Sequence, residues 1–140
     1  MKKTKKTVKK RESVIREYNM GTMSKSEFFT KIRQVLRNGF RYYKPLQEAL
    51  LKARRPSESS NKKLKWEFIC KECQTWHPRK NIEIDHVIPC GSLKDWDDVV
   101  PFIQKLCAED PNMYQVLCKP CHKAKTKQER ETKKKENGSI

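Results

Sequence analysis

Two cysteine pairs of identical spacing are the residues of this chain best suited to bind a metal ion. They are Cys70 with Cys73, and Cys118 with Cys121. Two such Cys-x-x-Cys pairs can supply four thiolates to one tetrahedral zinc ion. The pairs of a simple zinc ribbon lie about 15–20 residues apart, whereas 44 residues separate Cys73 from Cys118. The sequence therefore predicts a four-cysteine zinc site that closes around a larger structural element.

That element carries a second set of side chains with metal chemistry. Asp85 and His86 are adjacent at the end of an alternating apolar segment, and His122 directly follows the last cysteine. A carboxylate and an imidazole can hold a catalytic divalent ion, and a further imidazole can accept a proton near neutral pH. These residue types predict a second, catalytic metal site.

The composition limits the size of the core. Charged residues make up 36% of the 140 positions and apolar residues 35%, so we expect one small domain that relies on a metal for part of its stability. No apolar run approaches the roughly 20 residues that span a bilayer, and none follows the lysine-rich start. We therefore expect an intracellular protein with no membrane partner, in which the clustered cysteines bind metal and do not form disulfides.

The net charge of +16 is concentrated towards the two ends of the chain. Residues 1–65 hold 20 Lys and Arg against 5 Asp and Glu, whereas residues 66–122 hold 6 against 9. Residues 123–140 hold 7 against 3. Basic segments around a slightly acidic centre are typical of a protein that holds a polyanion and binds cations in its middle. The alternative interpretation is a solvated arm that only aids solubility.

Local patterns divide the chain into five regions. They are a basic, largely disordered arm (1–23) with a short helix over Ser13–Asn19, a basic helical hairpin (24–56), a polar linker (57–65), a metal-stapled domain (66–130) and a charged tail (131–140). The first hairpin helix is expected to start at the capping pattern of Ser24 and Glu27 and to stop at Asn38-Gly39. The second is expected from Pro45 to the residue before Pro56.

Within the metal-stapled domain, strands and helices are expected to alternate. The patterns predict strands over 66–70, 82–88 and 114–117, a short helix that starts around Asp97 or later, and a helix over 121–130. Cys90 and Cys107 are expected to be small buried apolar residues and not ligands. His77 is expected in an exposed loop.

This order of motifs resembles the HNH family of endonucleases, and most closely the small zinc-knuckle HNH proteins of bacteriophages. The resemblance covers residues 66–127 and rests on several independent spacings. They are the first cysteine pair, Asp85-His86-x-x-Pro89-x-Gly91, Gln115-Val-Leu-Cys118 and Cys121-His122-x-x-Lys125-Thr126. It implies an α+β fold of the ββα-metal type, stapled by a structural zinc on the four cysteines and preceded by the basic helical region.

The resemblance also implies roles for the remaining site residues. Asp85 and His122 would hold one catalytic divalent ion (Mg²⁺, Mn²⁺, Ni²⁺ or Zn²⁺), and His86 would be the general base in hydrolysis of a DNA phosphodiester bond. Family members carry an asparagine where this chain has Met113, and Asn112 stands one residue earlier. Either a one-residue bulge lets Asn112 still orient His86, or that clamp has been lost.

DNA is the partner that the charge and the resemblance imply. The candidate DNA-binding residues are Lys31, Arg33, Arg37, Arg41, Lys52, Arg54, Arg55, Lys125 and Lys127. Two alternatives to a phage-encoded nuclease in the host cytoplasm stay open. One is a zinc-stabilised DNA-binding protein with a degraded active site, and the other is an accessory protein that engages a phage packaging enzyme.

Overall fold

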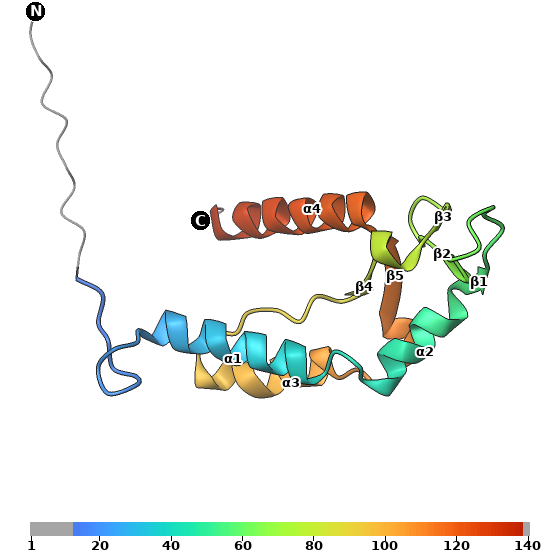
Figure 1. Ribbon diagram of the computed structural model, residues 1–140. Helices are drawn as coiled ribbons and strands as arrows, with labels where there is room; N and C mark the ends of the chain where they lie inside the picture. The colour runs from blue at the N-terminus through green and yellow to red at the C-terminus, as the bar shows by residue number, and fades with distance from the viewer. Residues whose placement is uncertain (1–12, 139–140) are drawn as a thin grey trace, which may run out of the picture.

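In the computed structural model, which describes residues 13–138, four α-helices and two small antiparallel sheets form an α+β fold (Figure 1). The helices are α1 (Lys25–Gly39), α2 (Lys44–Lys52), α3 (Val99–Leu106) and α4 (Lys119–Gly138), and the strands are β1 (Arg54–Pro56), β2 (Trp66–Ile69), β3 (Trp76–His77), β4 (Ile82–His86) and β5 (Tyr114–Cys118). One sheet has the order β1-β2-β3, and β4 pairs with β5 in the other. Across residues 13–138, no helix has the length and apolarity needed to cross a membrane.

Helix α1 begins where the sequence predicts. The Ser24 hydroxyl caps it by accepting a hydrogen bond from the backbone N–H of Glu27 at 3.2 Å. Glycine at position 39 is its last residue, as the Asn38-Gly39 stop predicts.

The short helix expected over Ser13–Asn19 is absent, so that prediction is wrong. Tyr18 instead pairs with Met23 across a tight turn, and Asn19 takes a left-handed backbone conformation with φ of 52°. A helix this short does not offset the cost of its own nucleation. The Tyr18 ring stacks on Phe28 of α1, with 4.5 Å between the ring centroids.

The largest apolar cluster lies between α1 and α3. Phe29 and Phe102 form its centre, with 1% and 0% of their surface exposed. Cys90, Leu93 and Leu106 complete its buried part, with Cys107 packed against it. The buried, apolar role predicted for Cys90 is therefore confirmed, and Cys107 lies at the edge of the same cluster. A 3₁₀ turn at Trp96–Asp98 leads into α3, as the predicted start near Asp97 requires.

Helices α1 and α2 do not form the expected hairpin. The apolar face of α2, with Leu50 and Ala53, packs on a separate cluster of Phe68, Ile82 and Val116 from β2, β4 and β5. Figure 1 shows α1 alongside α3, with α2 leading away from them towards the sheets. The prediction failed because each helix finds its apolar partner in a later part of the chain, not in its neighbour.

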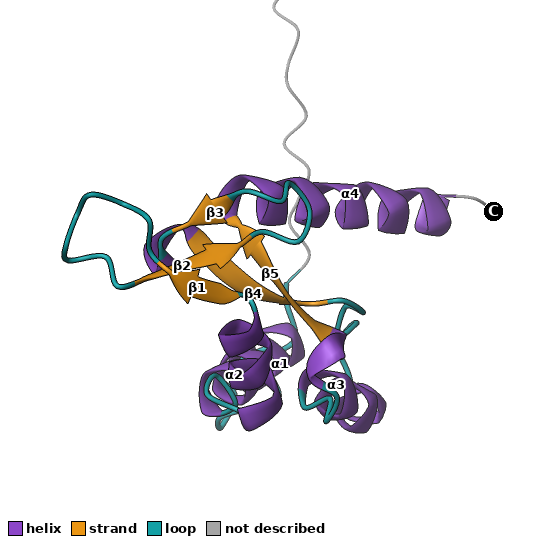
Figure 2. Ribbon diagram, turned by 90° about the vertical axis from the view of Figure 1, so that its right-hand side faces the viewer, coloured by secondary structure: helices purple, strands orange, loops and turns teal. Residues whose placement is uncertain are grey.

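Residues 57–65 are the loop of a β-hairpin and not a linker between domains. β1 pairs with β2, with Arg54 opposite Phe68 and Pro56 opposite Trp66. The backbone N–H of Ser57 donates to the carbonyl of Lys65 at 3.0 Å and closes the loop. The basic region of residues 24–56, called the basic leader below, therefore contributes a strand to the sheet that leads into the first cysteine pair (Figure 2).

The three main strands expected in the second half of the chain are present as β2, β4 and β5. β4 and β5 pair from Ile82 opposite Cys118 to His86 opposite Tyr114. β4 ends at His86, two residues before the predicted end. The tail expected over 131–140 is helical as far as the structure describes it, because α4 continues to Gly138. Lysine, glutamate and glutamine are good helix formers, and no proline interrupts this segment after Pro120.

We predict that Phe102→Ala lowers the free energy of unfolding by about 3–5 kcal/mol, the usual cost of removing a fully buried phenylalanine. Val100→Ala on the same helix is the matched control, because Val100 is 62% exposed and should change stability by less than about 0.5 kcal/mol. Denaturant unfolding at saturating zinc measures both. Equal stability of the two variants would show that the α1–α3 cluster does not hold the fold together.

Candidate metal centres

The four cysteines of the two pairs come together in space. Their Sγ atoms all lie within 4.8 Å of one another. Two sulfurs bound to one tetrahedral zinc ion at about 2.3 Å lie about 3.8 Å apart, and those of Cys73 and Cys118 are 3.9 Å apart. Among the described residues, this is the one group of three or more Cys, His, Asp or Glu side chains whose ligand atoms converge in this way. The cluster therefore fits a four-coordinate metal site.

The four cysteines come from three parts of the fold. Cys70 and Cys73 lie in the turn between β2 and β3. Cys70 directly follows β2, Cys118 is the last residue of β5, and Cys121 lies in the first turn of α4. Backbone hydrogen bonds from Cys70 N–H to the Thr75 carbonyl (3.0 Å) and from Gln74 N–H to the Cys70 carbonyl (2.9 Å) shape the first knuckle. A metal here would tie both sheets to α4.

The electrostatics of the cluster are uneven. The Thr75 hydroxyl, 3.0 Å from the Cys73 sulfur, is the main cause that lowers the pKa of Cys73 to about 5. Burial raises the pKa of Cys118. Four thiols this close cannot all ionise without a cation, so metal binding must release protons and weaken as the pH falls. His77 lies in β3, half-buried, with Nε2 2.7 Å from the Thr75 hydroxyl, and not in the exposed loop expected for it.

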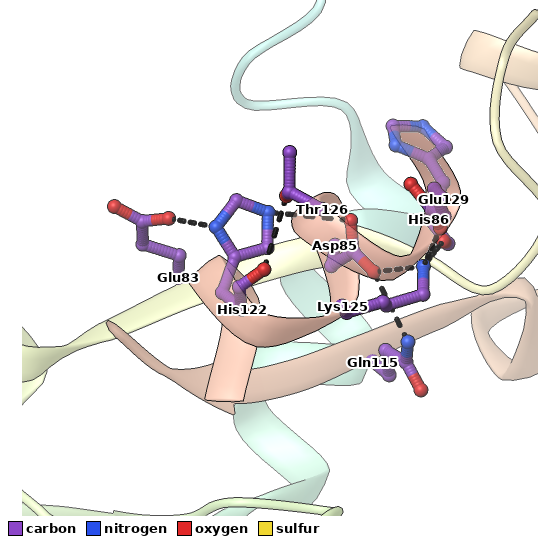
Figure 3. Close-up of polar contacts among 8 residues, drawn as sticks. All are labelled: Glu83, Asp85, His86, Gln115, His122, Lys125, Thr126 and Glu129. Atoms are coloured by element: carbon purple, nitrogen blue, oxygen red, sulfur yellow. Dashed lines mark hydrogen bonds and ion pairs between the residues drawn. The ribbon is translucent and has the colours of Figure 1, made fainter. Parts of the chain in front are cut away.

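A second centre lies where α4 crosses β4. Side chains alternate along a strand, so Glu83 and Asp85 share the face of β4 that α4 covers. His122 reaches this face from α4 and places its ring between the two carboxylates (Figure 3). Nδ1 of His122 lies 2.5 Å from Glu83 Oε2, and Nε2 lies 3.5 Å from Asp85 Oδ1.

The spacing of Asp85 and His122 fits one divalent ion. Ligand atoms at about 2.1 Å from one ion lie about 3.0 Å apart at right angles and about 3.4 Å apart in a tetrahedron. The observed 3.5 Å between Asp85 Oδ1 and His122 Nε2 is close to the second value. One carboxylate oxygen and one imidazole nitrogen also leave coordination positions for water or a substrate oxygen.

Glu83 is a member of this centre that our sequence reasoning missed. A carboxylate only accepts hydrogen bonds, so Nδ1 of His122 carries the proton of their contact. In a neutral ring the lone pair is then on Nε2, which faces Asp85. A carboxylate that fixes the tautomer of a ligand histidine is a common feature of metal sites. The alternation of Glu83 and Asp85 along β4 was the signal that could have found it.

Lys125 lies one helical turn after His122 and on the same side of α4. Its ammonium contacts Asp85 Oδ2 at 2.5 Å, the His86 carbonyl at 2.9 Å and Glu129 Oε1 at 2.9 Å. Gln115 also donates to Asp85 Oδ2, at 3.0 Å. Burial alone would raise the pKa of Asp85, but hydrogen bonds from Lys125 and Gln115 outweigh it and lower that pKa. Lys125, expected to contact DNA, is thus engaged within the protein.

The His86 ring is turned away from Asp85 and His122 (Figure 3). Nε2 of His86 lies 3.0 Å from the carbonyl oxygen of Leu106, at the end of α3, and the ring packs against Tyr114 with 4.9 Å between centroids. Because a carbonyl only accepts, Nε2 carries the proton and the lone pair of the neutral ring is on Nδ1. Among the described residues, no hydrogen bond involves Nδ1.

Asn112 is not brought to His86. It is exposed in a 3₁₀ turn (Pro111–Met113), where its backbone N–H donates to Asp110 Oδ1 at 2.9 Å. In the part of the chain that the structure describes, no hydrogen bond joins Asn112 to His86. Leu106 provides the orienting contact that the sequence led us to expect from Asn112. The Met113 carbonyl instead accepts from the N–H of Val87, just after β4 ends.

The expected DNA-binding residues differ in their solvent exposure and in their contacts within the protein. The exposed ones are Lys31, Arg37, Arg41, Lys52, Arg54 and Lys127. Arg33 and Arg37 lie over the Phe102 ring at 5.4 and 5.9 Å, which joins α1 to α3. Arg55 is half-buried between Glu67, at 3.2 Å, and the Trp76 ring, at 3.9 Å. Arg33, Arg37 and Arg55 therefore have partners within the protein.

Comparison of the chain with protein-family models, with curated proteins and with solved structures finds no match in any of the three.

We predict one zinc ion per chain on the four cysteines. Cys118→Ser should reduce the zinc content from one per chain to nearly none and abolish cooperative unfolding, since so small a core draws folding free energy from its metal. Cys107→Ser is the matched control, because Cys107 lies outside the cluster. Native mass spectrometry and melting curves measure the two effects. A zinc-free wild-type chain, or a Cys118→Ser variant that melts like wild type, would contradict the assignment.

Proposed function

We propose that this chain is a metal-dependent HNH endonuclease that hydrolyses phosphodiester bonds in DNA. The observation that carries the proposal is the pairing of Asp85 and His122 across β4 and α4. His86 follows Asp85 in the chain, and its ring is turned to the other side, towards the end of α3. The four-cysteine cluster supports the proposal, because a structural zinc there would hold α4 over β4. The pairing supports the ligand roles that the family resemblance implies for Asp85 and His122, and the base role of His86 stays part of the proposal.

The residues divide the chemistry among them. Asp85 and His122 would hold the divalent ion, which supplies Lewis-acid stabilisation of charge on the phosphoryl and leaving oxygens when bound. Glu83 would keep the His122 ring in the orientation that presents Nε2. His86, held through Nε2 by Leu106, would take the proton of the attacking water at Nδ1.

A second candidate function has one observation in its favour. Asn112 makes no side-chain hydrogen bond to His86 among the described residues, as a protein with a degraded active site would also show. Such a protein would bind DNA through its basic surface, or assist a packaging enzyme, without cleaving. Cleavage by the wild-type protein separates the two functions.

We predict different defects for the two histidines in divalent-metal-dependent plasmid cleavage. His86→Ala should lower the rate by about 10²–10⁴-fold, the scale of losing a positioned general base, with no rescue by added metal. His122→Ala should lose activity through weaker metal binding, so higher concentrations of Mn²⁺ should restore part of it. Gln104→Ala, at an exposed position of α3, is the control and should cleave like wild type.

Undiminished cleavage by His86→Ala would refute the mechanism. Equal rescue of both histidine variants by metal would refute the division of roles. Absence of any metal-dependent cleavage by the zinc-loaded wild type would favour the DNA-binding alternative.

We predict that exposed cations of α1, α2 and their junction contribute to DNA affinity. Replacing Lys31, Arg41 and Lys52 together by Gln should reduce the slope of log affinity against log salt by up to about 0.9 for each phosphate that the protein no longer neutralises. The matched control changes Lys62, Lys63 and Lys65 of the β1–β2 loop, which are also exposed and carry the same charge. Fluorescence anisotropy across a salt series measures both, and equal slopes for the two triple variants would reject a specific role for the helical residues.

A further inference from the structure

The contacts of Lys125 hold its ammonium group in one position, unlike that of a solvent-exposed lysine. An ammonium group has three N–H donors, and the Lys125 ammonium has three acceptors: Asp85 Oδ2, the His86 carbonyl and Glu129 Oε1. Only 26% of its side chain is exposed. Its charge is therefore fixed beside the candidate catalytic centre.

The two carboxylate oxygens of Asp85 therefore have different partners. Oδ2 accepts from both Lys125 and Gln115, whereas Oδ1 faces His122 Nε2. A divalent ion held with His122 would therefore meet a single free oxygen of Asp85. Figure 3 shows Lys125 and His122 on different sides of this carboxylate.

We propose that Lys125 restricts Asp85 to coordination through Oδ1 and sets the affinity and selectivity of the centre for divalent ions. The proposal rests on the metal centre of the proposed function. A positive charge fixed on one side of the carboxylate repels an ion on the other side and weakens its binding. It also acts against Ca²⁺, which takes six to eight oxygen ligands and often binds carboxylates through both oxygens, more than against the smaller, octahedral Mg²⁺.

A purely structural role for Lys125 makes the opposite prediction. If Lys125 only anchored α4 to β4, its loss would misplace His122 and Asp85 and weaken metal binding. If it acts as we propose, its loss strengthens metal binding. The sign of the change therefore separates the two roles.

The experiment measures metal binding by the full, zinc-loaded chain. Electron paramagnetic resonance of free Mn²⁺ gives the Mn²⁺ affinity, and competition against Mn²⁺ gives the affinity for Ca²⁺. The variants are Lys125→Met and Lys125→Arg, which keeps the charge. The matched control is Lys127→Met, because Lys127 is an exposed lysine on the same helix. The Mn²⁺ that the wild-type protein binds and His122→Ala does not bind is assigned to this centre.

We expect Lys125→Met to bind Mn²⁺ at least about tenfold more tightly, because a single and a double positive charge a few ångströms apart repel each other in a partly buried site. Ca²⁺ affinity should rise by a larger factor than Mn²⁺ affinity. Lys125→Arg and Lys127→Met should show no such increase.

Unchanged or weaker Mn²⁺ binding by Lys125→Met, with zinc content and melting temperature intact, would overturn the proposal and leave the proposed metal centre standing. An equal increase in Lys127→Met would also overturn it, because surface charge in general would then be the cause. If His122→Ala binds as much Mn²⁺ as the wild-type protein, the metal centre of the proposed function itself fails.

Discussion

The position of α4 relative to the β4–β5 pair is the constraint on which both candidate centres depend. Cys118 ends β5 and Cys121 lies in the first turn of α4, so a metal on the cysteines would fix the direction in which the helix leaves the strand. An α-helix turns by about 100° per residue. Cys121 and His122 therefore point in different directions, one to the cysteine cluster and the other to β4. One turn of helix thus carries a side chain of each candidate centre.

The position of His86 depends on apolar packing. His86 is oriented by the Leu106 carbonyl, and Tyr114 donates its hydroxyl to the same carbonyl at 3.0 Å. Leu106 is the last residue of α3, whose position depends on Phe102 packing against Phe29 of α1. The imidazole proposed as general base thus depends on the α1–α3 cluster, whereas the proposed metal ligands depend on the cysteines and α4.

The sequence predicted features that local spacing determines. The cysteine pairs, the alternation of β4 and the capping of α1 are short-range patterns, and the structure contains each of them. The partners of site residues were not predictable in this way. Lys125 meets Asp85 across 40 residues and His86 meets Leu106 across 20, and neither contact follows from periodicity. The same limit explains the wrong hairpin, because the apolar stripe of α1 does not reveal that its partner is α3.

The basic leader cannot be treated as a detachable DNA-binding arm. Phe29 of α1 is buried against residues between β4 and β5, and β1 pairs with the strand that leads into Cys70. Removing residues 1–56 would expose Phe102 and leave β2 with an unpaired edge, so any loss of DNA affinity would be confounded by unfolding. Only part of the charge of α1 lies away from its packed face. Lys31 is exposed, whereas Arg33 and Arg37 lie over Phe102 beside the buried Phe29. Substitution on the exposed face is therefore the change that separates electrostatic attraction from folding.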